Sequence, residues 1–335
     1  MRILVFGAGV LGSVYAGRLA AAGQNVALLA RGRRLEQLRR YGLILLDEAA
    51  GRETRPHITL VEELRPTDDY DLVVVIVRAE QVANALPLLA TNQRVPSFLF
   101  LHNRASGPET LIEALGQERV LLGFPGAGGA LDDARARYRL IPQQKTTLGE
   151  PDRRITPRMR RVAAVLRAAG FPVAISRRMD AWLKTHAAFV TVIAGAIYAA
   201  GGSCAALAQD PSGVPQLVRA VCQAFRALRA VRTPIEPRKL AALFLWLPLP
   251  VPIAYWRRYL GRPEAELIFA RHADAAVGEM LELVSELQKL MRDAPILTPD
   301  LDTTWAAIEQ RARAQIVTGE NVNFATAIDP AGRRP

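Results

Sequence analysis

The chain has little lysine, cysteine and histidine for its 335 residues. Of its 43 Lys and Arg residues only four are lysines, at positions 145, 184, 239 and 289. The two cysteines, Cys204 and Cys222, have no CxxC spacing, so we expect reduced core residues of a cytoplasmic protein. The four histidines lack metal-ligand spacing, and we therefore expect no structural metal.

The chain also lacks an unbroken apolar run long enough to cross a bilayer. The nearest candidate is LAALFLWLPLPVPIAYW at 240–256, where prolines at 248, 250 and 252 would break a helix. This segment is expected to be buried or to form an interface, without membrane contact. The N-terminus, MRILVFGAG, has neither the basic region nor the cleavage site of a signal peptide.

The formal net charge of +11 raises the question of nucleic-acid binding. The arginines, however, are spread along the whole chain, and there is no aromatic-basic RNA signature. We therefore expect no nucleic-acid partner. A positive field still favours anionic ligands such as a phosphorylated cofactor.

The first half of the sequence alternates between apolar β-type runs and helix-period segments. This alternation predicts an α/β protein with a doubly wound parallel sheet. A hairpin or edge pair is expected within 138–150, followed by a helix at 156–169. The expected strands are 3–6, 26–30, 72–77, 98–101, 120–124 and 172–176, and the helices between them are 10–22, 80–89 and 109–115.

Helical patterns dominate after about residue 180 and predict a C-terminal all-α domain. The expected helices are 180–199, 214–230, 263–292 and 299–317. We thus predict a nucleotide-binding domain over 1–178 and a helical domain over 179–320. The helical domain is expected to bind substrate and to carry the contact of a homodimer, if one forms. A disordered tail is expected over 321–335.

The glycine-rich stretch Gly7-Ala8-Gly9-Val10-Leu11-Gly12 follows the first strand and opens the first helix. A GxGxxG motif in this setting is the dinucleotide-binding fingerprint of Rossmann-type domains. Gly7 allows the tight turn, Gly9 lets the backbone approach a pyrophosphate, and Gly12 lets the helix pack closely. We expect Val10 and Leu11, at the helix N-terminus, to join the glycines in binding the cofactor.

The second strand ends in ARGRR rather than in the acidic residue that NAD enzymes place there for the ribose hydroxyls. Arg31 stands close to that position, with Arg33 and Arg34 behind it. A guanidinium suits a 2′-phosphate. The sequence therefore predicts NADP(H) rather than NAD(H).

Lys184 lies in the apolar stretch MDAWLKTHAAFVTVIAG. A lysine with its stem along an ordinary helix is one interpretation. The other is a proton donor, because a partly buried lysine can release its proton whereas an arginine cannot. Helical spacing places Ala188, Thr191 and Gly195 on its face, where small side chains would leave room for a ligand. Beside a cofactor domain, the second interpretation is favoured.

Two further residues are candidate ligands. Asn103 ends the apolar strand SFLFLHN, so its side chain would emerge at a carboxyl edge, where open α/β sheets bind ligands. Glu279 shares a helix face with Glu282 and Glu286 and is either a ligand or one of several solvated acids. The segment GFPGAGGA at 123–130 either frames a carboxylate with its amides or is an ordinary glycine loop.

Together these stretches resemble the ketopantoate reductase family of 2-dehydropantoate 2-reductases. The resemblance runs from Arg2 to about Thr304 through GAGVLG, VRAEQ (77–81), LHNRASG (101–107), GEPD (149–152), AWLK, GEMLEL (278–283) and ILTPDLDTTW (296–305). It implies a Rossmann domain, a helical domain, NADPH and a small-molecule 2-oxo acid substrate. It also implies Lys184 as the catalytic lysine, Asn103 as a cofactor and substrate ligand, and Glu279 as a substrate ligand. Arg78 and Gln81 match cofactor-binding positions.

The sequence departs from the family pattern mainly around the substrate. The family's asparagines four and eight residues after the lysine are Ala188 and Val192 here, and a serine is missing near Leu267. Arg78 replaces a lysine, and LHNR replaces LQNG. Three functions stay open: reduction of ketopantoate or a related 2-oxo acid, the same chemistry on a less polar ketone, and non-catalytic sensing of NADP(H).

Overall fold

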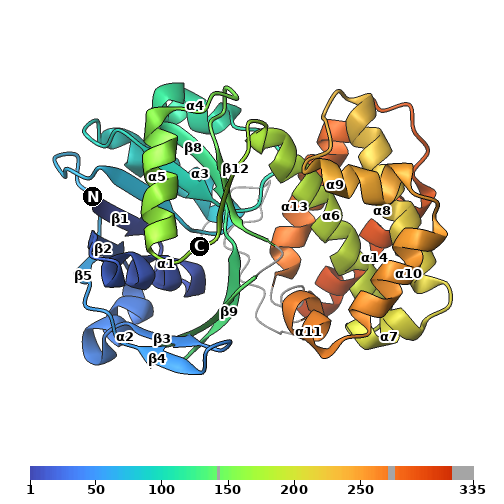
Figure 1. Ribbon diagram of the computed structural model, residues 1–335, viewed down its shortest axis with the longest axis horizontal. Helices are drawn as coiled ribbons and strands as arrows, with labels where there is room; N and C mark the ends of the chain where they lie inside the picture. The colour runs from blue at the N-terminus through green and yellow to red at the C-terminus, as the bar shows by residue number, and fades with distance from the viewer. Residues whose placement is uncertain (142–143, 271–275, 319–335) are drawn as a thin grey trace, which may run out of the picture. The chain divides into compact units, whose positions relative to one another are not determined.

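The computed structural model describes residues 1–141, 144–270 and 276–318, apart from the side chains of Glu80, Leu267, Ile268, Val317 and Thr318. The chain divides into two compact units, Met1–His186 and Ala187–Pro335 (Figure 1). The division falls inside helix α6 (Met179–Ala199), eight residues after the predicted boundary at 178. The tail that was expected to be disordered, 321–335, lies outside the described residues.

An eight-stranded sheet forms the centre of the first unit, in the order β12-β11-β8-β7-β6-β1-β2-β5. All neighbouring pairs are parallel except β11 and β8. The chain leaves β1 toward β2 on one side and returns to β6 on the other, which confirms the doubly wound prediction. The strands are β1 Arg2–Phe6, β2 Asn25–Leu29, β5 Thr59–Val61, β6 Leu72–Val75, β7 Phe98–Leu101, β8 Val120–Phe124, β11 Thr146–Gly149 and β12 Val173–Ile175.

A second sheet of four strands, in the order β4-β3-β10-β9, was not predicted. Its strands are β3 Ile44–Asp47, β4 Arg52–Thr54, β9 Ala127–Asp132 and β10 Arg135–Leu140. The predicted pairing within 138–150 was wrong. β10 pairs with β9 and β3 in this sheet, whereas β11 joins the large sheet beside β8 and β12. One partner of β10, β3, is distant in sequence, and the other, β9, is its neighbour in the chain but contains two glycines, so the local pattern revealed neither pairing.

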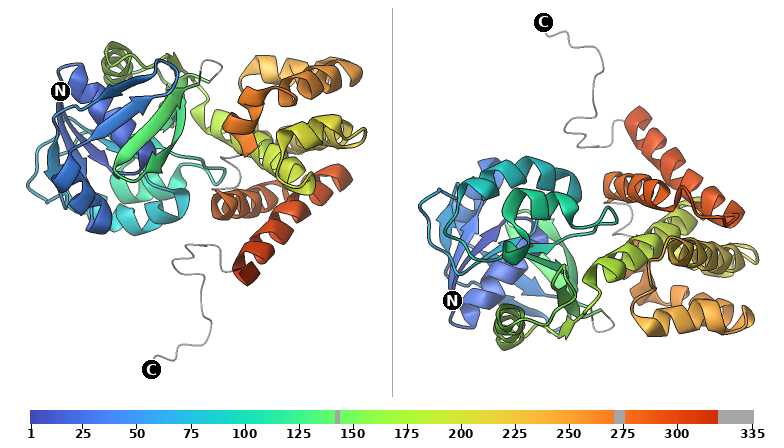
Figure 2. Two further views of the ribbon diagram at one scale, coloured as in Figure 1. Left: turned by 90° about the horizontal axis from the view of Figure 1, so that it is seen from below. Right: turned by 90° about the horizontal axis from the view of Figure 1, so that it is seen from above.

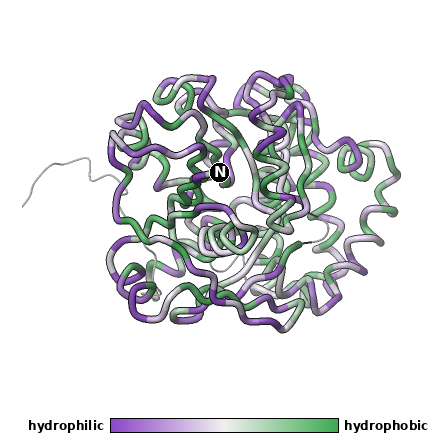
Figure 3. The backbone as a smooth tube through the Cα atoms, turned by 60° about the vertical axis from the view of Figure 1, so that its left-hand side comes forward, coloured by the Kyte–Doolittle hydropathy of each residue, from purple (hydrophilic) through white to green (hydrophobic). Residues whose placement is uncertain are grey.

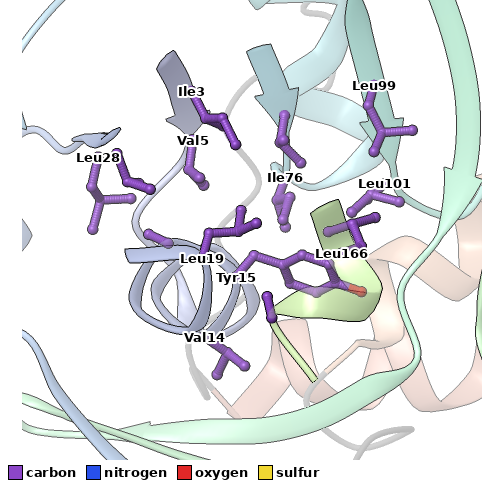
Figure 4. Packing of buried hydrophobic residues seen from close by; sticks show 14 of the residues in the cluster. Ile3, Val5, Val14, Tyr15, Leu19, Leu28, Ile76, Leu99, Leu101 and Leu166 are labelled. Atoms are coloured by element: carbon purple, nitrogen blue, oxygen red, sulfur yellow. The ribbon is translucent and has the colours of Figure 1, made fainter. Parts of the chain in front are cut away.

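The two faces of the large sheet bury separate clusters, because side chains alternate along each strand. In β1, Ile3 and Val5 join the cluster beneath α1 and α5, while Leu4 and Phe6 join the opposite one. Figure 4 shows the first cluster, with Tyr15 of α1 among the strand residues. In Figure 3 most hydrophilic segments lie at the periphery of the view.

The helices of the first unit start and end where local sequence dictates. Helix α5 is capped by the Thr156 hydroxyl, which accepts from the Met159 amide at 3.2 Å, and Pro157 occupies its first turn. The chain leaves the helix through Gly170, whose φ is +78°. The helices are α1 Val10–Ala21, α2 Gly32–Tyr41, α3 Ala79–Thr91, α4 Glu109–Leu115, the short η1 Gln117–Arg119 and α5 Pro157–Ala168.

The second unit is helical over its described residues (Figure 2). α14 packs on α8 and α13, and α10 packs on α7 and α8. The predicted helix 263–292 was wrong as one element, since α11 and a π-helical turn precede residues outside the description. The elements are α7 Cys204–Gln209, α8 Gly213–Ala230, α9 Arg238–Ala241, η2 Ala242–Trp246, α10 Pro250–Leu260, α11 Pro263–Ala265, η3 Glu266–Ala270, α13 Val277–Met291 and α14 Pro299–Thr318.

Within the described part of the chain, one helix has the length and apolar composition to cross a membrane. It is α6, and 67% of its most apolar window is buried inside the protein, the pattern of a core helix. The proline-containing segment 240–256 is only partly buried. Phe244 and Trp256 are in the interior, but residues 246–251 are all exposed.

Candidate active site

The glycine loop between β1 and α1 is shaped by two close approaches. A Cβ on Gly7 would lie 2.3 Å from the Ile76 carbonyl oxygen, and the φ of Gly7 is +115°. A Cβ on Gly12 would lie 1.8 Å from the Gly7 carbonyl oxygen. Gly9 differs, because a Cβ there would meet nothing within 4 Å. The loop therefore presents open backbone at Gly9 alone of these three glycines.

Gly9 is also the residue before the first turn of α1, and no side chain caps this helix end. The first amides of a helix have no partner within the helix, and the helix dipole favours an anion there. Val10 and Leu11 begin that turn and are only half-buried. A phosphate group fits this cradle in charge, in hydrogen-bonding capacity and in the space in front of Gly9.

Arginines surround the loop on the side of β2. The Arg31 Nε donates to the Glu62 backbone carbonyl at 3.0 Å, and its guanidinium is exposed. Arg34 reaches the loop itself: its Nε donates to the Ala8 carbonyl at 3.1 Å and its Nη2 to the Ser13 hydroxyl at 3.1 Å. Arg34 thus supports the loop, while the side chains of Arg31 and Arg33 are exposed.

The strands β1, β6, β7 and β8 are adjacent and parallel, so their carboxyl ends meet at one edge of the sheet. The glycine loop follows β1, and the exposed Arg78 follows β6. Buried Asn103 follows β7. Gln81 caps α3, because its side-chain oxygen accepts from the Arg78 amide at 3.2 Å. These predicted residues are therefore brought to a common edge.

The segment of α6 that carries Lys184 lies at the end of the next strand, β8. Phe124 is the last residue of β8, and its ring centroid lies 4.1 Å from that of His186 and 5.4 Å from that of Trp182. Trp182 and His186 stack on each other at 5.1 Å. Lys184 lies between them in sequence, two residues from each, so by helical phase its side chain points away from this ring stack.

The Lys184 ammonium donates to the Asp180 carboxylate at 2.7 Å, one helical turn earlier. The lysine side chain is 13% exposed and the aspartate side chain 34%. This partner was missed at the sequence level, although the i, i+4 spacing in MDAWLK could have revealed it. The pair holds a positive charge in a fixed direction on the helix.

His102 and Arg104 flank Asn103 and replace residues of the family pattern. Burial, and secondarily the charge of Arg104, lower the pKa of His102 to about 3. The Arg104 Nη2 donates to the Thr110 hydroxyl at 2.6 Å and fastens the loop to α4. His102 is therefore neutral near physiological pH, which leaves Lys184 as the stronger candidate for a proton donor.

The expectation that small residues leave room beside Lys184 was wrong for the later part of the helix. A Cβ on Gly195 would lie 2.2 Å from the Thr304 carbonyl oxygen, so α14 packs directly on this face. Thr191 is fully buried and accepts a hydrogen bond from the Trp305 indole at 3.1 Å. Ala188 is fully buried as well. Small residues here serve helix packing.

Two other glycine-containing motifs are structural. Residues 127–130 form the start of β9 and pair with β10, and the Gly126 amide donates to the Thr146 hydroxyl at 3.1 Å. In GEPD, the buried Glu150 carboxylate accepts from Arg158 Nε at 3.0 Å and also from the Thr156 hydroxyl. These contacts tie β11 to its neighbours and to α5.

Glu279 lies in the first turn of α13 and is half-buried. Its carboxylate is favourably placed with respect to the helix dipole there. Glu282 and Glu286 on the same helix are also half-buried rather than fully solvated. Among the described residues, no group of three His, Cys, Asp or Glu side chains is placed to hold a metal ion.

The family model for the ketopantoate reductase PanE/ApbA matches residues 3–153. An uncharacterised oxidoreductase of Bacillus subtilis, YkpB, is 27% identical over 190 residues, or 55% of this chain and 61% of that protein. A 2-dehydropantoate 2-reductase of Mesorhizobium japonicum is 26% identical over 208 residues, or 55% of this chain and 63% of that protein. The chain thus covers about three fifths of the length of these two relatives.

The structure of D-mandelate dehydrogenase with NADH and anilino(oxo)acetate is similar in fold. Its TM-score is 0.75 at 16% identity, over 94% of this chain and 99% of that one. This likeness covers both the sheet domain and the helical region. The predicted fold class, a Rossmann-type domain followed by helices, is confirmed.

Proposed function

We propose that the chain is an NADPH-dependent reductase of a 2-oxo acid, because residues 3–153 match the family model for ketopantoate reductase that the sequence resembles. The observation that supports the proposal is the Lys184 ammonium, which donates to the Asp180 carboxylate in the helix segment whose Trp182 and His186 rings pack against Phe124 at the end of β8. The product would be the corresponding 2-hydroxy acid. The reduced, buried Cys204 and Cys222 suit a cytoplasmic enzyme.

The cofactor is proposed to bind along the carboxyl ends of β1 and β6. Gly7, Gly9 and Gly12 with the amides of Val10 and Leu11 would hold the pyrophosphate, and Arg31 would hold the 2′-phosphate. Arg78, Gln81 and Asn103 would contact the remainder. When bound, the nicotinamide supplies the hydride. The open backbone at Gly9 supports a dinucleotide of either kind, and the absence of an acidic residue among 31–34 supports NADPH over NADH.

Lys184 is proposed to act as the general acid. Charge develops on the substrate oxygen as its carbonyl carbon is reduced, and a positioned ammonium stabilises that charge and then donates its proton. Asp180 would act as a positioning residue by directing Nζ. Asn103 would donate a hydrogen bond from its amide to the substrate. Glu279 is retained as a substrate ligand on the family resemblance.

The proposed substrate is ketopantoate or a related 2-oxo acid. The second candidate is a less polar ketone. The solved D-mandelate dehydrogenase holds anilino(oxo)acetate, an aromatic 2-oxo acid analogue, on a similar fold. In this chain Ala188 and Val192 stand where the family has asparagines, and both are fully buried. Because two hydrogen-bonding side chains of the family pattern are missing here, a less polar substrate is the second candidate.

The test is NADPH oxidation against a panel of 2-oxo acids that includes ketopantoate and phenylglyoxylate. Lys184→Ala is expected to lower kcat by about 10²–10⁴-fold while leaving NADPH binding unchanged. Lys184→Arg should fail almost as badly, because a guanidinium keeps the charge but does not release the proton. If no 2-oxo acid supports oxidation, the non-catalytic NADP(H)-sensing alternative replaces the reductase. Wild-type turnover by Lys184→Ala would remove the lysine from the mechanism.

A further inference from the structure

An exposed apolar corner stands out on the second unit. The six residues 246–251, with sequence WLPLPV, are all exposed, and we call them the WLPLPV corner. Trp246 is 62% exposed, and Tyr255 one turn into α10 is 52% exposed. Soluble monomers rarely show such contiguous apolar surface unless it has a binding role. The corner contains none of the residues assigned above to catalysis or to cofactor binding.

A bend between two helical segments, and aromatic packing beneath it, hold the corner on the surface of the second unit. η2 ends at Trp246, Pro250 starts α10, and the helical segments on either side are bent by 117°. Just beneath, Phe244 packs edge-on against Phe225 at 5.7 Å, and Trp256 packs against Phe189 at 5.4 Å. The base is thus anchored in the core while its tip stays in solvent.

Basic residues lie on both sides of the corner in the sequence. Between residues 237 and 263 there are five cations and no acidic residue. All five cationic residues are exposed: Arg238, Lys239, Arg257, Arg258 and Arg262. α9, which ends shortly before the corner, carries two of them, and α10, which begins within it, carries two more (both helices are labelled in Figure 1).

We propose that the WLPLPV corner docks on the surface of an anionic lipid bilayer. Trp and Tyr favour the membrane–water interface, where apolar tips enter the headgroup region and neighbouring Lys and Arg meet anionic lipids. The bend and the prolines oppose a spanning helix, so the contact is with the surface. A symmetric contact with a second copy is disfavoured, because it would bring one cationic rim against another. This revises the expectation, drawn from the prolines alone, of no membrane contact.

The experiment is flotation of the full chain with vesicles of phosphatidylcholine, with and without phosphatidylglycerol. The protein should bind only the anionic vesicles, and less at high salt. Trp246 is the one exposed tryptophan of the four, so binding should shift the fluorescence to shorter wavelength. Trp246→Ser with Leu247→Ser should weaken binding at least tenfold, since each large apolar side chain contributes more than that factor when buried.

Two control variants sharpen the result. Leu297→Ser removes an apolar side chain that is 90% exposed elsewhere and should leave vesicle binding unchanged. Lys239→Gln with Arg258→Gln should lower the preference for anionic vesicles while keeping the apolar corner. NADPH-dependent turnover and the melting temperature should stay at wild-type values in all these variants. A failure of the reductase assay would leave vesicle binding unaffected, so the two proposals fail separately.

Three outcomes would overturn the proposal. One is absence of flotation with anionic vesicles. Another is flotation that Trp246→Ser with Leu247→Ser does not weaken. The third is a concentration-dependent dimer, seen by analytical ultracentrifugation, which the same double variant dissociates while vesicle binding is absent. That last result would assign the corner to a second copy of the chain.

Discussion

Asp180→Asn tests whether the carboxylate beside Lys184 takes part in catalysis. The 2.7 Å contact is in the range of charge-assisted hydrogen bonds, which contribute about 1.5–3 kcal/mol. The Asp180 side chain is 34% exposed, and solvent screening reduces this to about 1–2 kcal/mol. Asparagine keeps the shape and an acceptor oxygen but loses the charge. If the loss falls on the transition state, kcat should decrease by about 5–30-fold.

Steady-state NADPH oxidation measures kcat and KM for both substrates in Asp180→Asn, Lys184→Ala and the double variant. The KM for NADPH should not change. The double variant should be no slower than Lys184→Ala, because a positioning residue acts only through the group that it positions. Glu309→Gln is a matched control, since it removes the acid of another i, i+4 pair, with Arg313 at 3.9 Å. Wild-type kcat in Asp180→Asn, or additive losses in the double variant, would refute the reasoning.

Further predictions concern the cofactor loop and the neighbouring histidine. Arg31→Ala should weaken NADPH binding at least tenfold in a fluorescence titration and leave NADH binding unchanged. Arg33→Ala, at another exposed arginine, serves as the control. Equal losses of affinity for both cofactors would contradict the 2′-phosphate role. Gly12→Ala should lower the melting temperature strongly, because its Cβ would lie 1.8 Å from a carbonyl oxygen, whereas Gly9→Ala should melt normally yet bind NADPH poorly. His102 has a pKa of about 3 when folded against 6.5 ordinarily, so unfolded chains bind more protons between these values and stability falls as pH decreases through that window. Urea unfolding at about pH 7 and about pH 4 should show a smaller decrease in stability for His102→Gln than for wild type, by about 3 kcal/mol. An unchanged decrease would exclude His102 as its source.

The large sheet could be predicted because each of its inner strands is a short, continuous apolar run between helical patterns. Ile3–Phe6, Leu72–Val75 and Phe98–Leu101 are buried on both faces, so their composition alone identifies them. The small sheet gave no such signal. β4 is Arg-Glu-Thr and fully exposed, and β9 contains two glycines. Its two local pairs, β3 with β4 and β9 with β10, join into one sheet only through the long-range pairing of β3 with β10, which local pattern does not encode.

In the candidate site, too, some features could be predicted from local sequence and others could not. The motif and its arginine could be predicted, because the chemistry of phosphate binding requires particular residue types at fixed spacing. The small residues after Lys184 were misjudged because their spacing fits a ligand pocket and a close helix contact equally well. Only the position of Thr304, more than a hundred residues later, decides that Gly195 serves packing. Tertiary partners thus decide what a local pattern leaves open.

Within the glycine motif, some glycines are required by the fold and one is explained only by ligand binding. Gly7 and Gly12 are required whether or not a nucleotide binds, because a side chain at either would collide with backbone. They therefore indicate how the loop closes and not what it holds. Gly9 has no such steric need, so an alanine there would be tolerated by the empty loop. Its selection as glycine is accounted for by a ligand that must approach the backbone, and this residue, with Arg31, carries the evidence for a phosphorylated cofactor.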